Sequence, residues 1–171
     1  TIQSDDGPDF VTPLDSVTVT SPTTSHTFSG LADGQTSWYR VLATESLGVP
    51  SAWSTSTSST QDNAAPTGSI LFNSGDVYTN LPEVSLSIAA SDPGSNPSGL
   101  TDMRLSNDGS IWLDWEPFST NRLWQLAPLD GQKIVFVEFR DQSGNVSSSL
   151  TSDTIVLDTR APEAVIELID P

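Results

Sequence analysis

Apolar and polar residues alternate with a period of two along several segments, and this period is typical of strands with one buried face. The segment 84–88 alternates without a break, and a later segment places Val135, Val137 and Phe139, or the opposite set, toward a core. Turn pairs such as Asp33-Gly34 separate these segments. No apolar stripe with helical spacing persists beside helix caps. The pattern therefore predicts an all-β chain.

Several landmarks recur in the same order, which indicates an internal repeat. Asp62 and Asp158 are 96 residues apart, and so are Pro66 and Pro162. The other matching segments are 45–48 with 141–144 and, with a slip of one residue, 31–35 with 128–132. A period of about a hundred residues is typical of an immunoglobulin-like β-sandwich.

The repeat divides the chain into three parts. Residues 65–161 hold a whole repeat, and residues 1–64 correspond to the later part of one, with its first two strands absent. We expect those strands to precede Thr1 in a longer chain or to come from another chain, because a sandwich without them would expose unpaired edges. Residues 162–171 are expected to form the opening strand of a following module or a donated strand.

The residues of both repeats are similar to those of known modules. Residues 1–64 resemble the second half of a bacterial fibronectin type III domain, through the segments 30–34, 38–44 and 51–54. Residues 65–161 resemble a bacterial Ig-like repeat, through the segments 89–92, 103–110, 115–118, 139–147 and the linker 158–162. Two departures are Ser37, where a corner tyrosine is usual, and the Glu45 and Val49 pair, which replaces the aspartate and asparagine of the second repeat.

The resemblance implies tandem immunoglobulin-like and fibronectin type III-like β-sandwiches. Such modules mostly space, display or link other domains outside the cell. It therefore implies a non-catalytic structural or adhesive repeat segment of a large extracellular or cell-surface protein, such as a stalk, surface layer or fibre. This is an argument by analogy, since fold does not fix function.

Charge and composition narrow the partners. The chain has 6 Lys and Arg against 22 Asp and Glu, a formal net charge of −16. Such a chain repels phosphate, so we expect no nucleic acid as a partner. It has no cysteine, which excludes disulfides and thiolate zinc sites. No apolar run approaches the roughly 18 residues that would span a bilayer, so we expect no membrane insertion.

Catalytic chemistry has little support in the sequence. The only histidine, His26, shares a face with Phe28 in a Ser/Thr-rich segment, and we interpret it as a partly buried strand residue. Asp114 and Glu116 flank Trp115 and could form a glycosidase pair, but they alternate outward on a strand beside a turn. No nucleophile elbow, paired-histidine zinc motif or phosphate loop is present. We therefore expect the chain not to be an enzyme.

Calcium is the strongest cofactor hypothesis. Calcium takes six to eight oxygen ligands, which loop carboxylates and amides supply. In an Ig-like sandwich, the loops that carry Asp92, Asp141 and Asn145 lie at the end where the chain enters, and the entering linker carries Asp62. These residues are predicted to hold calcium at the module junction, and Asp158 is predicted to serve the next junction. The alternative is that Asp92 and Asp141 only accept backbone amides in turns.

Aromatic residues and the chain end support two alternative functions. Trp112, Trp115 and Trp124 lie close in sequence. If Trp112 and Trp124 were exposed and coplanar, the chain could be a carbohydrate-binding accessory module of a secreted enzyme. Our interpretation is instead that Trp115 is the core tryptophan and that the other two pair across strands. The apolar segment 164–169 suggests a filament subunit that donates a strand to other copies of itself.

Overall fold

The computed structural model describes residues 1–167, and all of their regular secondary structure is β-strand. The chain separates into two compact units. The first contains residues Thr1–Ala64 and the loop Pro93–Ser98; the second contains Ala65–Asp92 and the residues from Gly99 onward.

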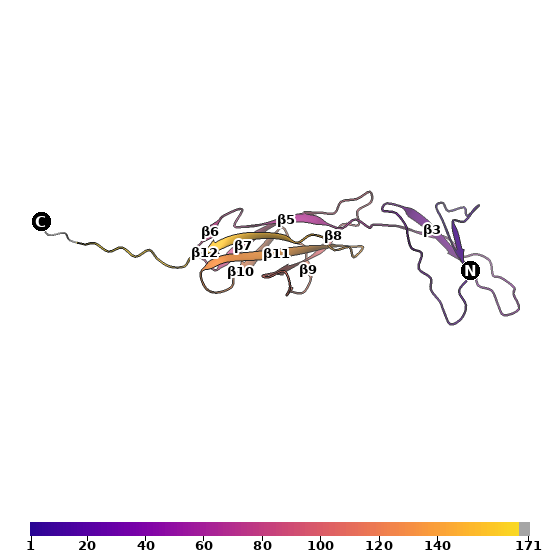
Figure 1. The fold of residues 1–171 in the computed structure, drawn as a ribbon. Helices are drawn as coiled ribbons and strands as arrows, with labels where there is room; N and C mark the ends of the chain where they lie inside the picture. The colour runs from indigo at the N-terminus through magenta and orange to yellow at the C-terminus, as the bar shows by residue number, and fades with distance from the viewer. Residues whose placement is uncertain (168–171) are drawn as a thin grey trace. The chain divides into compact units, whose positions relative to one another are not determined.

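The second unit is a sandwich of two sheets (Figure 1). One sheet has the order β10-β7-β5 and the other β6-β12-β11-β8-β9. The strand bounds are β5 (Thr67–Phe72), β6 (Tyr78–Thr79), β7 (Glu83–Ser91), β8 (Leu100–Ser106), β9 (Glu116–Pro117), β10 (Asn121–Gln125), β11 (Gly131–Asp141) and β12 (Thr151–Leu157). All pairs are antiparallel except β6 with β12, which is parallel. The predicted all-β class and the predicted β-sandwich are confirmed for this unit.

Alternating side chains from both sheets form the core of this sandwich. On β7 the alternating residues Val84, Leu86 and Ile88 are all buried, as their spacing predicts. On β11 the structure selects the set Val135, Val137 and Phe139, and each of them is fully buried. The opposite set on β11 is only half-buried. The period of two therefore locates the strands, and the facing sheet decides which side of β11 is buried.

The tryptophan assignments from the sequence are wrong in two respects. The core tryptophan is Trp124 on β10, which is 7% exposed, whereas Trp115 is half-buried and lies outside the core cluster. Trp112 and Trp124 are not cross-strand partners, because Trp124 pairs with Val84 and Trp112 bridges to Ser106. Sequence spacing alone does not reveal which strands become neighbours in a sandwich.

Trp112 and Trp115 stack with two arginines of the five-stranded sheet, Arg104 on β8 and Arg140 on β11. The Arg104 guanidinium carbon lies 4.9 Å from the ring centroid of Trp112 and 4.6 Å from that of Trp115. The Arg140 guanidinium lies 4.5 Å from the Trp115 centroid. The same arginines form ion pairs, Arg104 with Glu138 and Arg140 with Asp102. The guanidinium groups thus contact these half-buried rings and are themselves held by ion pairs.

The first unit contains one sheet, of order β2-β1-β3-β4. Its strands are β1 (Ile2–Asp5), β2 (Asp15–Val17), β3 (Thr36–Val41) and β4 (Thr57–Thr60). This order matches that of β9-β8-β11-β12 in the second unit. The register of β3 with β4 matches that of β11 with β12, because Thr36 pairs with Thr60 as Gln132 pairs with Val156, and both members are offset by 96 residues. The repeat found in the sequence is therefore a repeat of the same sheet.

His26 does not lie on a strand, contrary to our interpretation of its segment. The segment 18–35 contains no strand, and His26 is exposed, with its ring edge-on to Phe28 at 4.8 Å. The repeat offset places residues 25–29 at β10, whose partner in the second unit is β7. Within the described part of the first unit, no strand corresponds to β7. A strand without a neighbour to receive its backbone hydrogen bonds does not form.

The C-terminal segment is only partly described. Residues 161–167 have no regular secondary structure, and Val165 and Ile166 are 92% and 90% exposed. The predicted opening or donated strand within 162–171 therefore has no pairing partner over 162–167. Its residues 168–171 lie outside the described part of the chain.

Removing a core side chain should destabilise the second unit far more than removing an exposed one. Leu86 is 0% exposed, so Leu86→Ala should lower the free energy of unfolding by about 2–5 kcal/mol, because it leaves a cavity. Leu71→Ala is the matched control: that side chain is 45% exposed, and the expected loss is under about 1 kcal/mol. Urea denaturation measures both. Equal losses would contradict the assigned core.

Candidate metal centre and linker carboxylates

Asp141 ends β11 as a buried carboxylate held by a tight turn. Its side chain is 2% exposed. The Asn145 backbone N–H donates to Asp141 Oδ1 at 2.8 Å, and the Asn145 side-chain Nδ2 donates to Oδ2 at 2.8 Å. The turn between them includes Gly144 at φ 93°, a conformation that glycine adopts without strain. The turn fixes the Asp141 carboxylate at one end of the sandwich.

Asp92 directly follows β7 and lies beside Asp141. The Gly99 N–H donates to Asp92 Oδ2 at 2.7 Å, whereas Asp92 Oδ1 is buried without a hydrogen-bond partner in the described structure. Carboxylate oxygens of Asp92 and Asp141 lie within 4.8 Å of each other. Over residues 1–167, no basic side chain forms an ion pair with either group. The pair therefore combines two negative charges with one unsatisfied acceptor.

This geometry suits a hard cation. Two carboxylates at such a separation repel each other by about 3 kcal/mol at an effective dielectric constant near 20. Calcium prefers carboxylate and amide oxygens, and the unsatisfied Oδ1 of Asp92 is an available oxygen ligand. Asn145 could add an amide oxygen if its side chain turned over. The residues present therefore fit a calcium ion.

Asp62 belongs to the first unit, where it accepts backbone amides at the end of the linker. The Ala64 N–H donates to Asp62 Oδ1 at 3.1 Å, and the Ser98 N–H donates to Oδ2 at 2.8 Å. Hydrogen bonds from the Ser98 side chain and backbone hold the pKa of Asp62 below its ordinary value of 3.8. Asp62 is 4% exposed, so its charge is stabilised by these donors more than by water.

Asp33 has the same role in the first unit. The Asn63 N–H donates to Asp33 Oδ1 at 3.0 Å, and the Ser95 N–H donates to Oδ2 at 3.0 Å. The Ser95 and then the Asn63 backbone hydrogen bonds lower the pKa of Asp33, while the charge of Asp62 opposes this shift. The loop Pro93–Ser98 is thus held through two of its backbone amides, those of Ser95 and Ser98. No sequence motif indicated these contacts.

Asp158 is not grouped with Asp92 and Asp141. It follows β12, where Leu157 pairs with Gly131 at the start of β11, whereas Asp141 is the last residue of β11. The two carboxylates therefore lie at opposite ends of the second unit. The Arg160 N–H donates to Asp158 Oδ1 at 3.1 Å. The structure thus brings together Asp92, Asp141 and Asn145 in the second unit.

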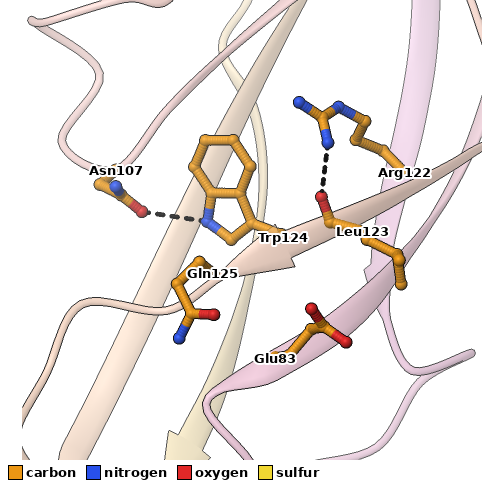
Figure 2. A pocket seen from close by; sticks show the side chains of 6 residues that line it. All are labelled: Glu83, Asn107, Arg122, Leu123, Trp124 and Gln125. Atoms are coloured by element: carbon orange, nitrogen blue, oxygen red, sulfur yellow. Dashed lines mark hydrogen bonds between the residues drawn. The ribbon is translucent and has the colours of Figure 1, made fainter.

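The pocket around Trp124 lacks an exposed ring for sugar stacking (Figure 2). This hollow of about 400 Å³ is lined by Glu83, Asn107, Arg122, Leu123, Trp124 and Gln125. The Trp124 Nε1 donates to Asn107 Oδ1 at 3.1 Å, which turns the edge of the ring toward a polar neighbour. The exposed pair of Trp112 and Trp124 that the carbohydrate hypothesis requires is not found, since Trp124 is buried.

Among solved structures, the chain is similar to the fibronectin(III)-like modules of Clostridium thermocellum CbhA. The identity is 18% and the TM-score 0.55, over 98% of this chain and 83% of that chain. At this identity the similarity shows a fibronectin type III-like fold. No protein-family model and no curated protein matches the chain.

No described helix is long and apolar enough to cross a membrane.

The lowered pKa values predict a loss of stability in acid. Asp33 is stabilised as the carboxylate, so its contribution is complete above pH 3.8 and is lost as the pH falls through its lowered pKa. Asp33→Asn should lower the melting temperature at pH 6, and this difference from the wild type should shrink at pH 3. Thermal unfolding at both pH values measures it. Asp114→Asn, at an exposed carboxylate, should show no such pH-dependent difference.

Proposed function

We propose that the chain is a non-catalytic structural or adhesive repeat segment of a large extracellular or cell-surface protein. The observation that carries this proposal is a linker arrangement repeated in both units. The carboxylate of Asp33 accepts the Asn63 amide as Asp130 accepts the Thr159 amide, each at 3.0 Å. A chain that repeats its sheet and its linker contacts at one period is built for serial connection of modules.

The fibronectin type III-like fold and the chain's chemistry support this role. The second unit is proposed to be a bacterial Ig-like module, on the segments that resemble such repeats. The strong negative charge keeps an array of modules soluble and discourages collapse between neighbours. A cysteine-free, Ser/Thr-rich and acidic composition supports an extracellular prokaryotic setting. The proposed partners are neighbouring modules of the same chain.

Calcium is proposed to stiffen the segment. Asp92 and Asp141 would supply the first carboxylates, Asn145 an amide oxygen, and Asp62 a further carboxylate. Bound calcium would neutralise the carboxylates and hold the loops that carry them in one arrangement. Asp158 would have the same role at the next junction.

Thermal unfolding with calcium and with chelator tests this proposal. At a free calcium concentration of about 100 times its dissociation constant, binding to the folded state alone adds roughly 2.7 kcal/mol of stability. We therefore expect a clear rise in the melting temperature with calcium. Magnesium at the same concentration should give a smaller rise, because it demands a tighter octahedral site.

Asp92→Asn provides the sharpest variant. The new amide keeps an oxygen that can accept the Gly99 N–H and removes the charge beside Asp141. In chelator the variant should be at least as stable as the wild type, because the repulsion is relieved. With calcium it should lose most of the stabilisation.

Asp114→Asn is the control for Asp92→Asn, since Asp114 is exposed and lies outside the proposed ligands. It should retain the full calcium response. A wild-type melting temperature that is identical in calcium and in chelator would overturn the calcium proposal. In that case Asp92 and Asp141 would act only as acceptors for backbone amides.

A further inference from the structure

An aspartate follows the last strand of each unit, and in both units one of its carboxylate oxygens accepts the same kind of backbone hydrogen bond. Asp62 and Asp158 occupy equivalent positions, and each accepts at Oδ1, at 3.1 Å, the N–H two residues ahead. Asp33 and Asp130 are also equivalent. Asp33 accepts the N–H of Asn63, which follows Asp62, and Asp130 accepts the N–H of Thr159, which follows Asp158, each at 3.0 Å. This first set of bonds fastens the linker to its own unit and is complete in both.

The second oxygens differ between the two units. In the first unit, Asp33 Oδ2 and Asp62 Oδ2 accept the amides of Ser95 and Ser98 from the loop Pro93–Ser98. In the second unit, Asp158 is exposed, and its Oδ2 has no hydrogen-bond partner within residues 1–167. Asp62 at the equivalent position is buried. One acceptor that receives a loop in the first unit is therefore open in the second.

The second oxygen of Asp130 accepts only from an exposed side chain. The Arg160 Nε donates to Asp130 Oδ2 at 3.0 Å, but the Arg160 side chain is 84% exposed. Ion pairs of this kind contribute little to stability, so a backbone amide can replace the guanidinium at small cost. Both second oxygens at this end can therefore accept donors from outside.

The space around these carboxylates is also open. In the first unit, a Cβ atom at Gly34 would lie 2.7 Å from the Ser95 Cβ, so the loop rests directly on that glycine. At the equivalent Gly131, a Cβ atom would meet nothing within 4 Å. Beside Asp158 lies a hollow of about 470 Å³, lined in part by Tyr78 and Leu81, which are 71% and 63% exposed. These exposed groups offer apolar contact area to a docking module.

We propose that Asp130 and Asp158 form the receiving site for a loop of a following module of the same type. The ligand is a loop like Pro93–Ser98, which presents two backbone N–H groups three residues apart and a glycine at close approach. Gly94 has φ 117°, and a Cβ atom there would lie 2.9 Å from the Ala64 Cβ, so only glycine fits. This inference rests on the proposed function as a serial repeat. It specifies which groups of one module would bind the next.

The test uses the chain extended by a second copy of residues 65–160 joined after Arg160, which preserves the repeat period. The second unit has its own two-sheet core, so the added copy should fold. Amide exchange measured by NMR in chelator reports the Ser95 and Ser98 amides of the original and added loops separately. We expect the added loop to exchange at least about tenfold more slowly than an unstructured loop, as a hydrogen-bonded amide does.

Two isosteric variants test the two acceptors one at a time. Asp158→Asn keeps an oxygen for the Arg160 amide and replaces the other oxygen with a donor, so only the added Ser98 amide should lose protection. Asp130→Asn should unprotect the added Ser95 amide in the same way. The original loop is the internal control, because Asp33 and Asp62 are unchanged. Asp114→Asn should leave all four amides protected.

Exchange of the added loop that neither variant changes would overturn this inference, as would an added loop without protection in the parent chain. Unchanged chemical shifts on β7 and β11 show that each variant is folded. Because the exchange is measured in chelator, its outcome is independent of calcium. Failure here together with a positive calcium response would reject the docking site and leave the proposed function in place.

Discussion

The burial of alternating side chains between two sheets is the constraint on which the second unit depends. Leu86 on β7 and Val137 on β11 are both fully buried, and they belong to the two facing sheets. Successive side chains of a strand point to opposite faces of the sheet, so when one face is buried the other can carry polar residues. On β8 and β11 the outward residues Arg104 and Arg140 support the tryptophan stack. The packing of the buried residues fixes where the strands end, and Asp92 and Asp141 lie at such strand ends.

A shortage of positive charge is the second constraint. With 22 acidic residues and 6 basic ones, the aspartates at strand ends cannot all form ion pairs. Backbone amides take that role: Asp33, Asp62 and Asp130 each accept at least one, and their pKa values are lowered accordingly. Asp92 and Asp141 also accept backbone amides, but they lie close together, and Asp92 Oδ1 is left buried without a hydrogen-bond partner in the described structure. Both proposed sites follow from this shortage.

The two units show that a segment forms a strand only where a neighbouring strand can pair with it. Residues 121–125 form β10 because β7 lies beside them, whereas the equivalent residues 25–29 form no strand. Each segment carries an aromatic residue at the same repeat position, Phe28 in the first unit and Trp124 in the second. A backbone segment needs a partner for its N–H and C=O groups, and the described first unit has no equivalent of β7.

The sequence alone determined the strand class, the repeat of 96 residues and the aspartates that end the strands, because periodicity and spacing are local properties. It also indicated that Asp92, Asp141 and Asn145 share one end of a sandwich. Only the tertiary structure decided that Trp124 rather than Trp115 enters the core, and that Asp92 Oδ1 lacks a donor. Those outcomes depend on which strands become neighbours and on where each hydrogen bond goes. Both are long-range properties, which spacing along the chain does not encode.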